Sequence, residues 1–184
     1  PDVNCLRCIE GLPMSLSRRH LATVAMLTAA AAAGWLAFGR SATHEPAPQV
    51  SYTLLDGQKL STDTLKGQVV LVNFWATSCT TCVAEMPEIM ATYEKYKARG
   101  YQTVAVAMAY DPPAYVANFA QTRKLPFGVA IDNTGAIAKG FGDIKLTPTT
   151  FLINKRGEIV KRYVGAPDFE ALHTLVEKLL AEKA

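Results

Sequence analysis

The residues most able to do chemistry in this chain are two cysteines, Cys79 and Cys82, separated by two threonines. They follow an apolar run at 69–74, which is short, rich in β-branched residues and bounded by polar ones, and so predicts a buried strand. The stretch at 80–99 predicts a helix, so both cysteines stand where a strand passes into a helix N-terminus. Unpaired backbone N–H groups and the positive end of the helix dipole favour a thiolate there. The pattern predicts a site for reversible thiol–disulfide exchange.

The elements that must position this pair alternate between strands and helices. A short edge strand is predicted at 50–54, and further strands at 68–76, 102–109, 128–131, 149–153 and 158–164. Helices are predicted at 80–99, from 112 onward, at 135–140 and from 168 onward. Helical crossovers favour parallel pairing in the first half, whereas the turn at 154–157 indicates an antiparallel hairpin. This order predicts an α/β domain with a mixed sheet and helices on both faces.

Local signals mark the helix ends. Gly100 is expected to end the helix at 80–99, and Pro87 inside it predicts a kink or a local break. Asp168 is expected to cap the last helix, which carries apolar side chains on one face. Three large apolar side chains are assigned to the core rather than to a substrate groove: Met108, Phe127 and Phe141.

The composition bounds the classes of protein that the chain can belong to. It has 184 residues, of which 49% are hydrophobic and 19% charged, and this excludes disorder as the main state. The net charge of +3 is too small to favour nucleic-acid binding. Four cysteines are too few for a disulfide scaffold in a domain of this size.

The segment 20–38 has no side chain charged at neutral pH, and as a helix it would span roughly 28 Å, close to the bilayer core. Arg18 and Arg19 precede it, and the positive-inside rule then places the following domain outside the cytoplasm, in the bacterial periplasm or on the outer membrane face. We expect an uncleaved inner-membrane anchor. A cleaved signal peptide, which would release a soluble exported domain, is the alternative, and a twin-arginine address is a further one.

These signals divide the chain into four parts. Residues 1–13 precede Met14, which begins a normal signal-anchor sequence, and are interpreted as an upstream extension. Residues 14–40 form the anchor or signal peptide, 41–49 a linker, and 50–184 the folded domain.

A second cysteine pair, Cys5 and Cys8, could in principle share a four-thiolate zinc site with the first. The predicted topology places the two pairs on opposite sides of a membrane, so no such site is expected. The histidines at 20, 44 and 173 are scattered without ligand spacing. We therefore predict no metal site.

Four motifs, in order along the chain, carry a resemblance to a known family. The stretch 69–87, VVLVNFWATSCTTCVAEMP, resembles the active-site sequence of the TlpA/ResA-like family, whose members are membrane-anchored, extracytoplasmic proteins of the thioredoxin superfamily. Residues 125–132 resemble the family's inserted helix–strand segment, and 146–160 its proline loop and terminal hairpin. The resemblance covers residues 50–182 and implies a thioredoxin fold with thiol–disulfide oxidoreductase activity.

Each cysteine has an expected role. Cys79, nearer the helix start, would attack a substrate disulfide, and Cys82, one turn further, would resolve the mixed disulfide. Asn73 stands where thioredoxins carry a buried aspartate, so another group must take the proton of Cys82. Glu85 matches a glutamate of the ResA-like active site and is expected to be a general base or proton relay, its pKa raised by partial burial. The alternative is a solvated surface glutamate.

Three further residues are assigned to substrate binding. Pro148 matches the family's cis-proline, which faces the disulfide, although an ordinary trans proline at a strand start is the alternative. A cis bond would expose the backbone of Thr147, which could pair with an extended substrate segment. Trp75, four residues before Cys79, is expected to shield the site, and packing as a core aromatic is compatible with this.

The predicted function is a membrane-tethered reductase of disulfides in partner proteins. The resemblance implies a thiol-type electron donor in the membrane, and substrates such as apocytochrome c or copper-site assembly factors. We expect a monomer that binds no nucleic acid and uses no cofactor besides a redox-active Cys79–Cys82 disulfide.

Two other functions are known on related folds. A thiol peroxidase would need a threonine three residues before its cysteine, where this chain has Ala76. A copper-carrying assembly factor would need wider cysteine spacing and a histidine in the proline-loop half of the domain. The only candidate histidine, His173, falls in the predicted last helix.

Overall fold

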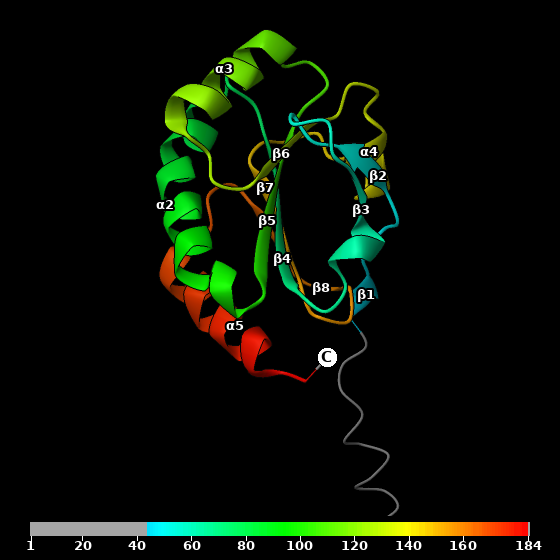
Figure 1. Cartoon of the computed structure of the whole chain (residues 1–184), viewed down its shortest axis with the longest axis vertical. Coiled ribbons are helices and arrows are strands. Elements are labelled where there is room, and N and C mark those ends of the chain that lie inside the picture. Colours follow the sequence, from blue (N-terminus) through cyan, green and yellow to red (C-terminus); the bar gives the residue numbers. More distant parts are fainter. Residues whose placement is uncertain (1–43, 184) are drawn as a thin grey trace, which may run out of the picture. The chain divides into compact units, whose positions relative to one another are not determined.

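The computed structural model describes residues 44–183 (Figure 1). The predicted extension with Cys5 and Cys8, and the predicted anchor at 14–40, lie outside the described residues. Within 44–183, no helix combines the length and the apolar character needed to cross a membrane.

The centre of the domain is strand β4 (Val69–Trp75), all of whose side chains are buried. The main sheet has six strands in the order β1 (Glu45–Pro46), β8 (Glu158–Val164), β7 (Thr149–Ile153), β4, β5 (Tyr101–Ala107) and β6 (Gly128–Ile131). Strands β4, β5 and β6 run parallel, whereas β7 and β8 are antiparallel to their neighbours. This is the predicted mixed sheet.

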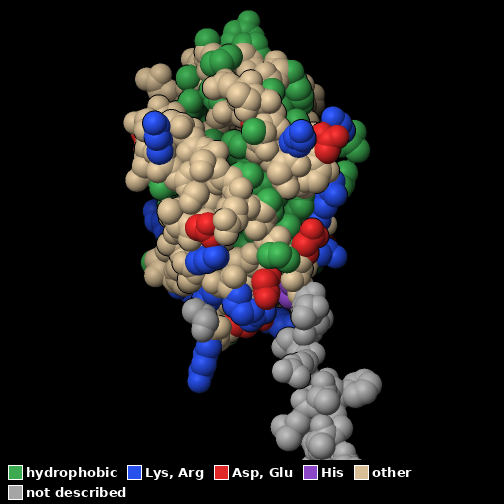
Figure 2. Space-filling view, turned by 90° about the vertical axis from the view of Figure 1, so that its right-hand side faces the viewer, with side chains coloured by type: hydrophobic (Ala, Val, Ile, Leu, Met, Phe, Trp, Pro, Cys, Tyr) green, Lys and Arg blue, Asp and Glu red, His purple; other side chains and the backbone are tan. Residues whose placement is uncertain are grey.

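Helices cover both faces of the sheet (Figure 1). One face carries α2 (Thr80–Tyr96), α3 (Pro113–Arg123) and α5 (Phe169–Ala181). Right-handed crossovers from β4 to β5 and from β5 to β6 place α2 and α3 on this same side. The other face carries α4 (Ala136–Gly140) and a two-stranded sheet of β2 (Ser51–Thr53) and β3 (Lys59–Ser61), and this side of the domain is turned toward the viewer in Figure 2. The short 3₁₀ helices are η1 (Thr62–Leu65) and η2 (Lys97–Arg99). The architecture is the thioredoxin fold.

Alternation along β4 decides which side chains meet α2. Val70, Val72 and Phe74 pack in the core cluster under α4, whereas Val69, Leu71 and Trp75 pack in the cluster under α2, α3 and α5. Successive side chains of a strand point to opposite faces, so Asn73 points to the same side as Trp75. The register of one strand thus places a polar amide under α2.

The helix ends follow the sequence signals with one difference. Gly100, with a φ of 86°, lies directly after η2 and ends the helical segment as predicted. The Asp168 carboxylate accepts hydrogen bonds from the N–H groups of Glu170 and Ala171 at 3.0 and 3.1 Å, which confirms the cap. Helix α2 continues through Pro87, so the local break considered there is absent.

The start of the domain holds elements that the sequence did not reveal. The stretch 50–54 does contain a strand, but β2 pairs with β3 in a separate sheet. Only Leu54, the last residue of the stretch, meets the edge of the main sheet, through a single antiparallel bridge to Ala130 of β6. The main sheet has β6 at one edge and β1 at the other, and β1 lies within the predicted linker and pairs with β8. Met108, Phe127 and Phe141 are buried, as expected for core residues.

Candidate active site

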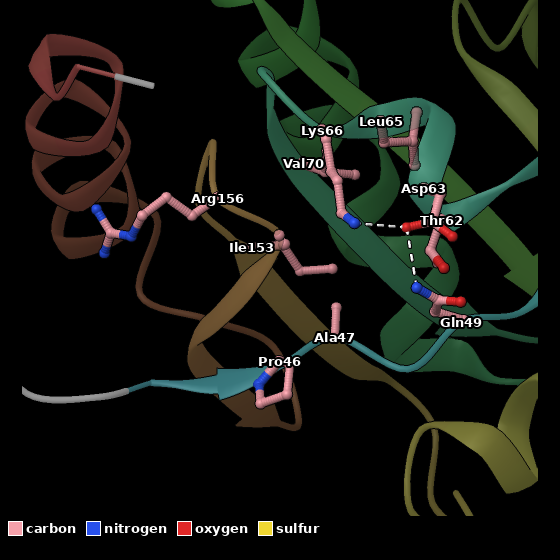
Figure 3. Close-up of a pocket in the computed structure, with 11 residues that line it drawn as sticks. Pro46, Ala47, Gln49, Thr62, Asp63, Leu65, Lys66, Val70, Ile153 and Arg156 are labelled. Atoms are coloured by element: carbon pink, nitrogen blue, oxygen red, sulfur yellow. Dashed lines mark hydrogen bonds and ion pairs between the residues drawn. The ribbon is translucent and has the colours of Figure 1, made fainter.

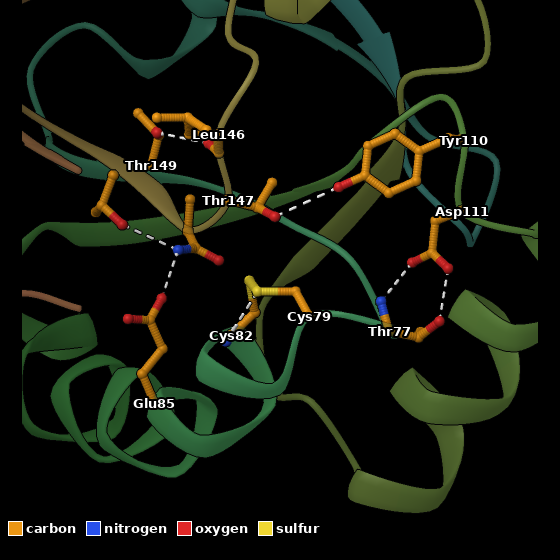
Figure 4. The surroundings of a disulfide bond; sticks show 11 residues. Thr77, Cys79, Cys82, Glu85, Tyr110, Asp111, Leu146, Thr147 and Thr149 are labelled. Carbon is orange, nitrogen blue, oxygen red and sulfur yellow. Dashed lines mark hydrogen bonds between the residues drawn. A yellow bond between two sulfur atoms is a disulfide. The ribbon is translucent and has the colours of Figure 1, made fainter. Parts of the chain in front are cut away.

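Cys79 and Cys82 form a disulfide at the N-terminus of α2 (Figure 4). Cys79 is the N-cap residue, and its Sγ accepts a hydrogen bond of 3.2 Å from the backbone N–H of Cys82. Cys79 is partly exposed, whereas Cys82 is 0% exposed. A partner can therefore reach one sulfur of the pair and not the other, which is the accessibility that the predicted roles require.

Glu85 lies one helical turn beyond Cys82 and is only 3% exposed. Its Oε1 accepts a hydrogen bond of 3.0 Å from Nδ2 of Asn73, and its buried Oε2 has no hydrogen-bond partner within the described part of the chain. Burial raises the pKa of Glu85 to about 7. The hydrogen bond from Asn73 lowers this pKa, but by less than burial raises it. The solvated-surface alternative is therefore excluded. A carboxyl group that titrates near neutral pH can both accept and return a proton.

Asn73 is fully buried and links two elements. Besides Glu85, its Nδ2 donates to Oγ1 of Thr150 at 2.9 Å, and Thr150 is its direct partner in the β4–β7 ladder. An aspartate in this position would place a second carboxyl group against Glu85. The amide instead leaves Glu85 as the single carboxyl group of this contact.

The Thr147–Pro148 peptide bond is cis, which confirms that prediction. Thr147 lies two residues before β7, and Figure 4 draws it among the residues that surround the disulfide. Among the described residues, neither its backbone N–H nor its C=O forms a hydrogen bond, whereas the C=O groups of Leu146 and Pro148 accept from Thr149 Oγ1 and Gly165 N–H at 2.7 and 2.8 Å. The Thr147 backbone is thus free to pair, as the predicted contact with a substrate segment requires.

The assignment of Trp75 to substrate binding is wrong, whereas core packing beside the cysteines is compatible with the expected shielding of the site. Its side chain is 0% exposed and packs against Phe119 of α3, with ring centroids 5.1 Å apart, in the same core cluster as Cys82. The ring supports the disulfide from the interior and offers no surface to a substrate. The reason is that α3 covers the end of β4 on this face, and spacing from the cysteines alone does not show this.

Residues of the β5–α3 loop were missed. The Asp111 carboxylate is 2% exposed and accepts hydrogen bonds from the backbone N–H of Thr77, at 2.6 Å, and from the Thr77 hydroxyl. The neighbouring Tyr110 places its hydroxyl 3.3 Å from Oγ1 of Thr147 (Figure 4). Loops that follow adjacent parallel strands lie at the same end of the sheet. The end of the strand predicted at 102–109 could therefore have indicated that the next residues lie near the cysteines.

His173 is engaged away from the cysteines. Its Nε2 lies 2.8 Å from Oγ1 of Thr92, and its ring packs edge-on against Tyr96. Partial burial is the main cause that lowers the pKa of His173. Within 44–183, no group of three or more His, Cys, Asp and Glu side chains could hold a metal ion.

A pocket of about 130 Å³ lies at the other end of the sheet (Figure 3). It is lined by Val70, near the start of β4, and by β1 and the β7–β8 turn. Three of its polar side chains pair with one another, since Asp63 Oδ1 pairs with Lys66 Nζ at 2.7 Å and accepts from Gln49 Nε2 at 3.1 Å. The chemistry is at the disulfide end instead.

Comparison with known proteins shows the family of the chain that carries this disulfide and cis-proline loop. The Redoxin family model covers residues 42–178. This chain belongs to the Redoxin family. Two similar Redoxin relatives are both called thiol-disulfide oxidoreductase ResA. The one from Bacillus thuringiensis is 38% identical over 133 residues, 72% of this chain and 76% of the relative. The one from Bacillus subtilis is 31% identical over 137 residues, 73% and 75% of the two chains.

Solved structures agree with the thioredoxin fold. A Neisseria meningitidis protein described as a thioredoxin is 40% identical, with a TM-score of 0.69 over 74% of this chain and 91% of that one. A thiol:disulfide interchange protein from Chlorobium tepidum is 28% identical, with a TM-score of 0.70 over 77% and 99%. This Redoxin domain is a thiol–disulfide oxidoreductase, as its motifs predicted.

Proposed function

We propose that this protein is a membrane-tethered, extracytoplasmic enzyme that reduces disulfides in partner proteins. The observation that carries the proposal is the unequal setting of the two cysteines. Cys79 is partly exposed, whereas Cys82 is buried one helical turn from Glu85, whose pKa is raised to about 7. A two-step exchange needs this division between a sulfur that meets the partner and a protected sulfur with a proton acceptor nearby.

In the first step, the thiolate of reduced Cys79 attacks one sulfur of the partner disulfide. The partner's S–S bond breaks, a mixed disulfide forms, and the departing partner thiolate takes up a proton. The N-cap position of Cys79 favours its thiolate, because the helix dipole and the N–H of Cys82 stabilise negative charge on Sγ.

In the second step, Cys82 gives its proton to Glu85 and attacks Cys79 Sγ. The mixed disulfide breaks, the second partner thiolate leaves, and the Cys79–Cys82 disulfide closes. Two electrons have then passed from the enzyme to the partner. A carboxyl group with a pKa near 7 is suited to accept this proton and return it in the next cycle.

The partner would approach as an extended segment. Its backbone would pair with the free N–H and C=O of Thr147, which places the partner sulfur beside Cys79. Pro148 maintains this loop in front of the disulfide. Protein substrates fit the name thiol-disulfide oxidoreductase that the curated relatives carry.

The location and the partners rest on the sequence. The uncharged segment 20–38 with Arg18 and Arg19 before it supports an inner-membrane anchor and an outward-facing domain. We propose a thiol-type electron donor in the membrane, and as substrates the cysteine pairs of apocytochrome c or of copper-site assembly factors. The enzyme would act as a monomer.

The test is to trap the partner in cells. Cys82→Ser removes the resolving sulfur, so partners should accumulate as mixed disulfides on Cys79 that mass spectrometry can identify. Cys79→Ser is the matched control and should trap far less. A folded Cys82→Ser protein that captures no partner contradicts the proposal. Alkylation of the wild-type protein in cells tests the direction, since a reductase should be found mainly with its two thiols reduced.

A further inference from the structure

Asp111 is a buried carboxylate that the exchange steps described above do not use. It is 2% exposed and lies in the loop between β5 and α3. Its Oδ2 accepts a hydrogen bond of 2.6 Å from the backbone N–H of Thr77, and its Oδ1 accepts from the Thr77 hydroxyl (Figure 4). Both hydrogen bonds are donated to Asp111, as an ionised carboxylate requires.

Thr77 belongs to the turn that presents Cys79. The turn runs from Ala76 to Cys79 and is closed by a hydrogen bond of 3.1 Å from the Cys79 N–H to the C=O of Ala76. Asp111 binds the second residue of this turn through both its backbone and its side chain. Cys79, the last residue of the turn, is the N-cap of α2. Asp111 thus fixes the segment that delivers the exposed cysteine to the helix start.

The charge of Asp111 is not paired with a cation in the described part of the chain. Within residues 44–183, no Lys, Arg or His side chain forms an ion pair with it. The N-terminus of α3, whose N-cap is Pro112, offers only a partial positive charge beside it. Thr77 is two residues from Cys79, so the carboxylate lies roughly 10 Å from the Cys79 sulfur.

A fixed negative charge at this position opposes a thiolate on Cys79. The dipole of α2 and the N–H of Cys82 stabilise the thiolate, whereas Asp111 repels it. The other titratable groups drawn beside the pair in Figure 4 are Glu85 on α2 and Tyr110, and the proline loop at 146–148 carries none. A less stable thiolate makes the dithiol easier to oxidise, so the pair becomes a stronger reductant.

We propose that Asp111 is a positioning residue for Cys79 and that its charge lowers the reduction potential of the Cys79–Cys82 disulfide. It fixes the turn that presents Cys79, and its carboxylate raises the pKa of the Cys79 thiol. The inference rests on the proposed function only for the direction of electron flow, because a lower potential suits a reductase. The effect itself concerns the disulfide at the start of α2, whichever partner it serves.

The experiment replaces the carboxylate by an amide of the same shape. Asp111→Asn retains an oxygen that can accept the Thr77 N–H and removes the charge. Two quantities are measured on the purified full-length protein. The pH dependence of iodoacetamide alkylation at Cys79, followed by mass spectrometry of its peptide, gives the pKa of the thiol. Equilibration with reduced and oxidised glutathione, read on the peptide that holds both cysteines, gives the reduction potential.

The wild-type protein should have the higher Cys79 pKa. Removal of a charge roughly 10 Å away, at an effective dielectric constant of about 40, should increase the thiolate fraction below that pKa about fourfold. The equilibrium constant for oxidation of the dithiol by glutathione disulfide should fall by up to the same factor at pH 8. Asp111→Asn should therefore be the weaker reductant.

Asp132→Asn is the matched control. Asp132 is also 2% exposed and accepts two hydrogen bonds, from the N–H groups of Ile137 and Ala138 at 3.1 and 2.8 Å. Those residues belong to α4, on the face of the sheet opposite α2, so the variant should leave both quantities as in the wild type.

Two results overturn the inference. One is an Asp111→Asn protein that retains the wild-type pKa and potential, or shifts them no more than Asp132→Asn does. The other is a loss of stability without either shift, which would show a purely structural role. Failure of the proposed function would appear elsewhere, as the absence of partners trapped by Cys82→Ser, and would leave both measured quantities unchanged.

Discussion

Asn73 and Glu85 meet at 3.0 Å across the interface between β4 and α2, with the amide Nδ2 donating to the carboxyl Oε1. The amide can stabilise the carboxylate without adding a charge, and its second hydrogen bond to Thr150 fixes its orientation. Glu85 is left as the single titrating group of this buried contact, with its pKa raised by burial to about 7. In the proposed exchange, this pair would make proton transfer to and from Cys82 sensitive to pH near neutrality.

Glu85→Gln should slow the resolving step and flatten its pH dependence. Above a pKa of about 7 Glu85 is charged and can take the proton of Cys82, so the wild-type rate should rise between pH 6 and 8. At pH 8 we expect the variant to be slower by at least about tenfold, the lower range for loss of a general base. Stopped-flow decay of a preformed mixed disulfide measures this step. Glu88→Gln, an exposed glutamate of the same helix, is the control, and a variant profile that matches the wild type would falsify the role.

The same substitution should change how stability depends on pH. The pKa of Glu85 is raised from 4.5 to about 7 in the folded state, so the folded protein holds this proton more tightly than the unfolded chain. The stabilisation that results is present below pH 4.5 and is lost as the pH rises to about 7. Glu85→Gln should remove this loss and raise the free energy of unfolding at pH 8 by up to about 3 kcal/mol. Urea unfolding of the oxidised proteins at pH 4.5 and 8 tests it. Equal pH slopes in both proteins would speak against the assignment.

Asn73→Asp should create a pair of carboxyl groups that cannot both ionise. The new group would face Glu85 at hydrogen-bonding distance in a buried site, so the pair would share a proton, with one macroscopic pKa raised further. We expect a loss of about 2 kcal/mol in unfolding free energy at pH 8, and little loss at pH 5. The double variant Asn73→Asp/Glu85→Gln restores one carboxyl group and one amide. It should recover most of the stability, and a failure to do so would point to packing rather than charge.

Asp111→Ala should destabilise the loop between β4 and α2, which contains Thr77 and Cys79. It leaves the backbone N–H of Thr77 without its acceptor and should cost about 1–3 kcal/mol in unfolding free energy. Asp111→Asn retains an oxygen acceptor and should cost less. Asp143→Ala removes an exposed aspartate paired with exposed Lys145 and should cost under about 1 kcal/mol. If the Asp111 and Asp143 alanine variants prove equally stable, the contact of Asp111 with Thr77 does not contribute to the free energy of unfolding.

The part of the site that could be predicted lies within short stretches of sequence. Cys79, Cys82 and Glu85 share the first turns of one helix, so their spacing alone relates them. Pro148 and Thr147 were found through the family's proline loop. The contacts of Thr150 and Asp111 could not be predicted, because they depend on strand register and on which loops share a sheet edge.

The fold, like the site, was predictable where it depends on local sequence and not where it depends on contacts between distant segments. The longer elements with clear periodicity were found with nearly correct ends. The strands β1 and β3 have two and three residues, too few for a period, and owe their conformation to their pairing partners. The burial of Trp75 depends on Phe119 of α3, and nothing local to the cysteines indicates that contact.

The short pairing of β1 with β8 also determines at which end of the sheet the described chain begins. Glu45 lies opposite Ile159, Ile159 opposite Ile153, and Ile153 opposite Val70, so the described chain begins at the sheet end where β4 starts. Cys79 follows the other end of that seven-residue strand, roughly 20 Å away at the usual rise per residue. Residue 44, the first described residue, therefore lies at the sheet end opposite the disulfide. A tether of the kind proposed above would join the domain at this end, the end of β4 farthest from Cys79.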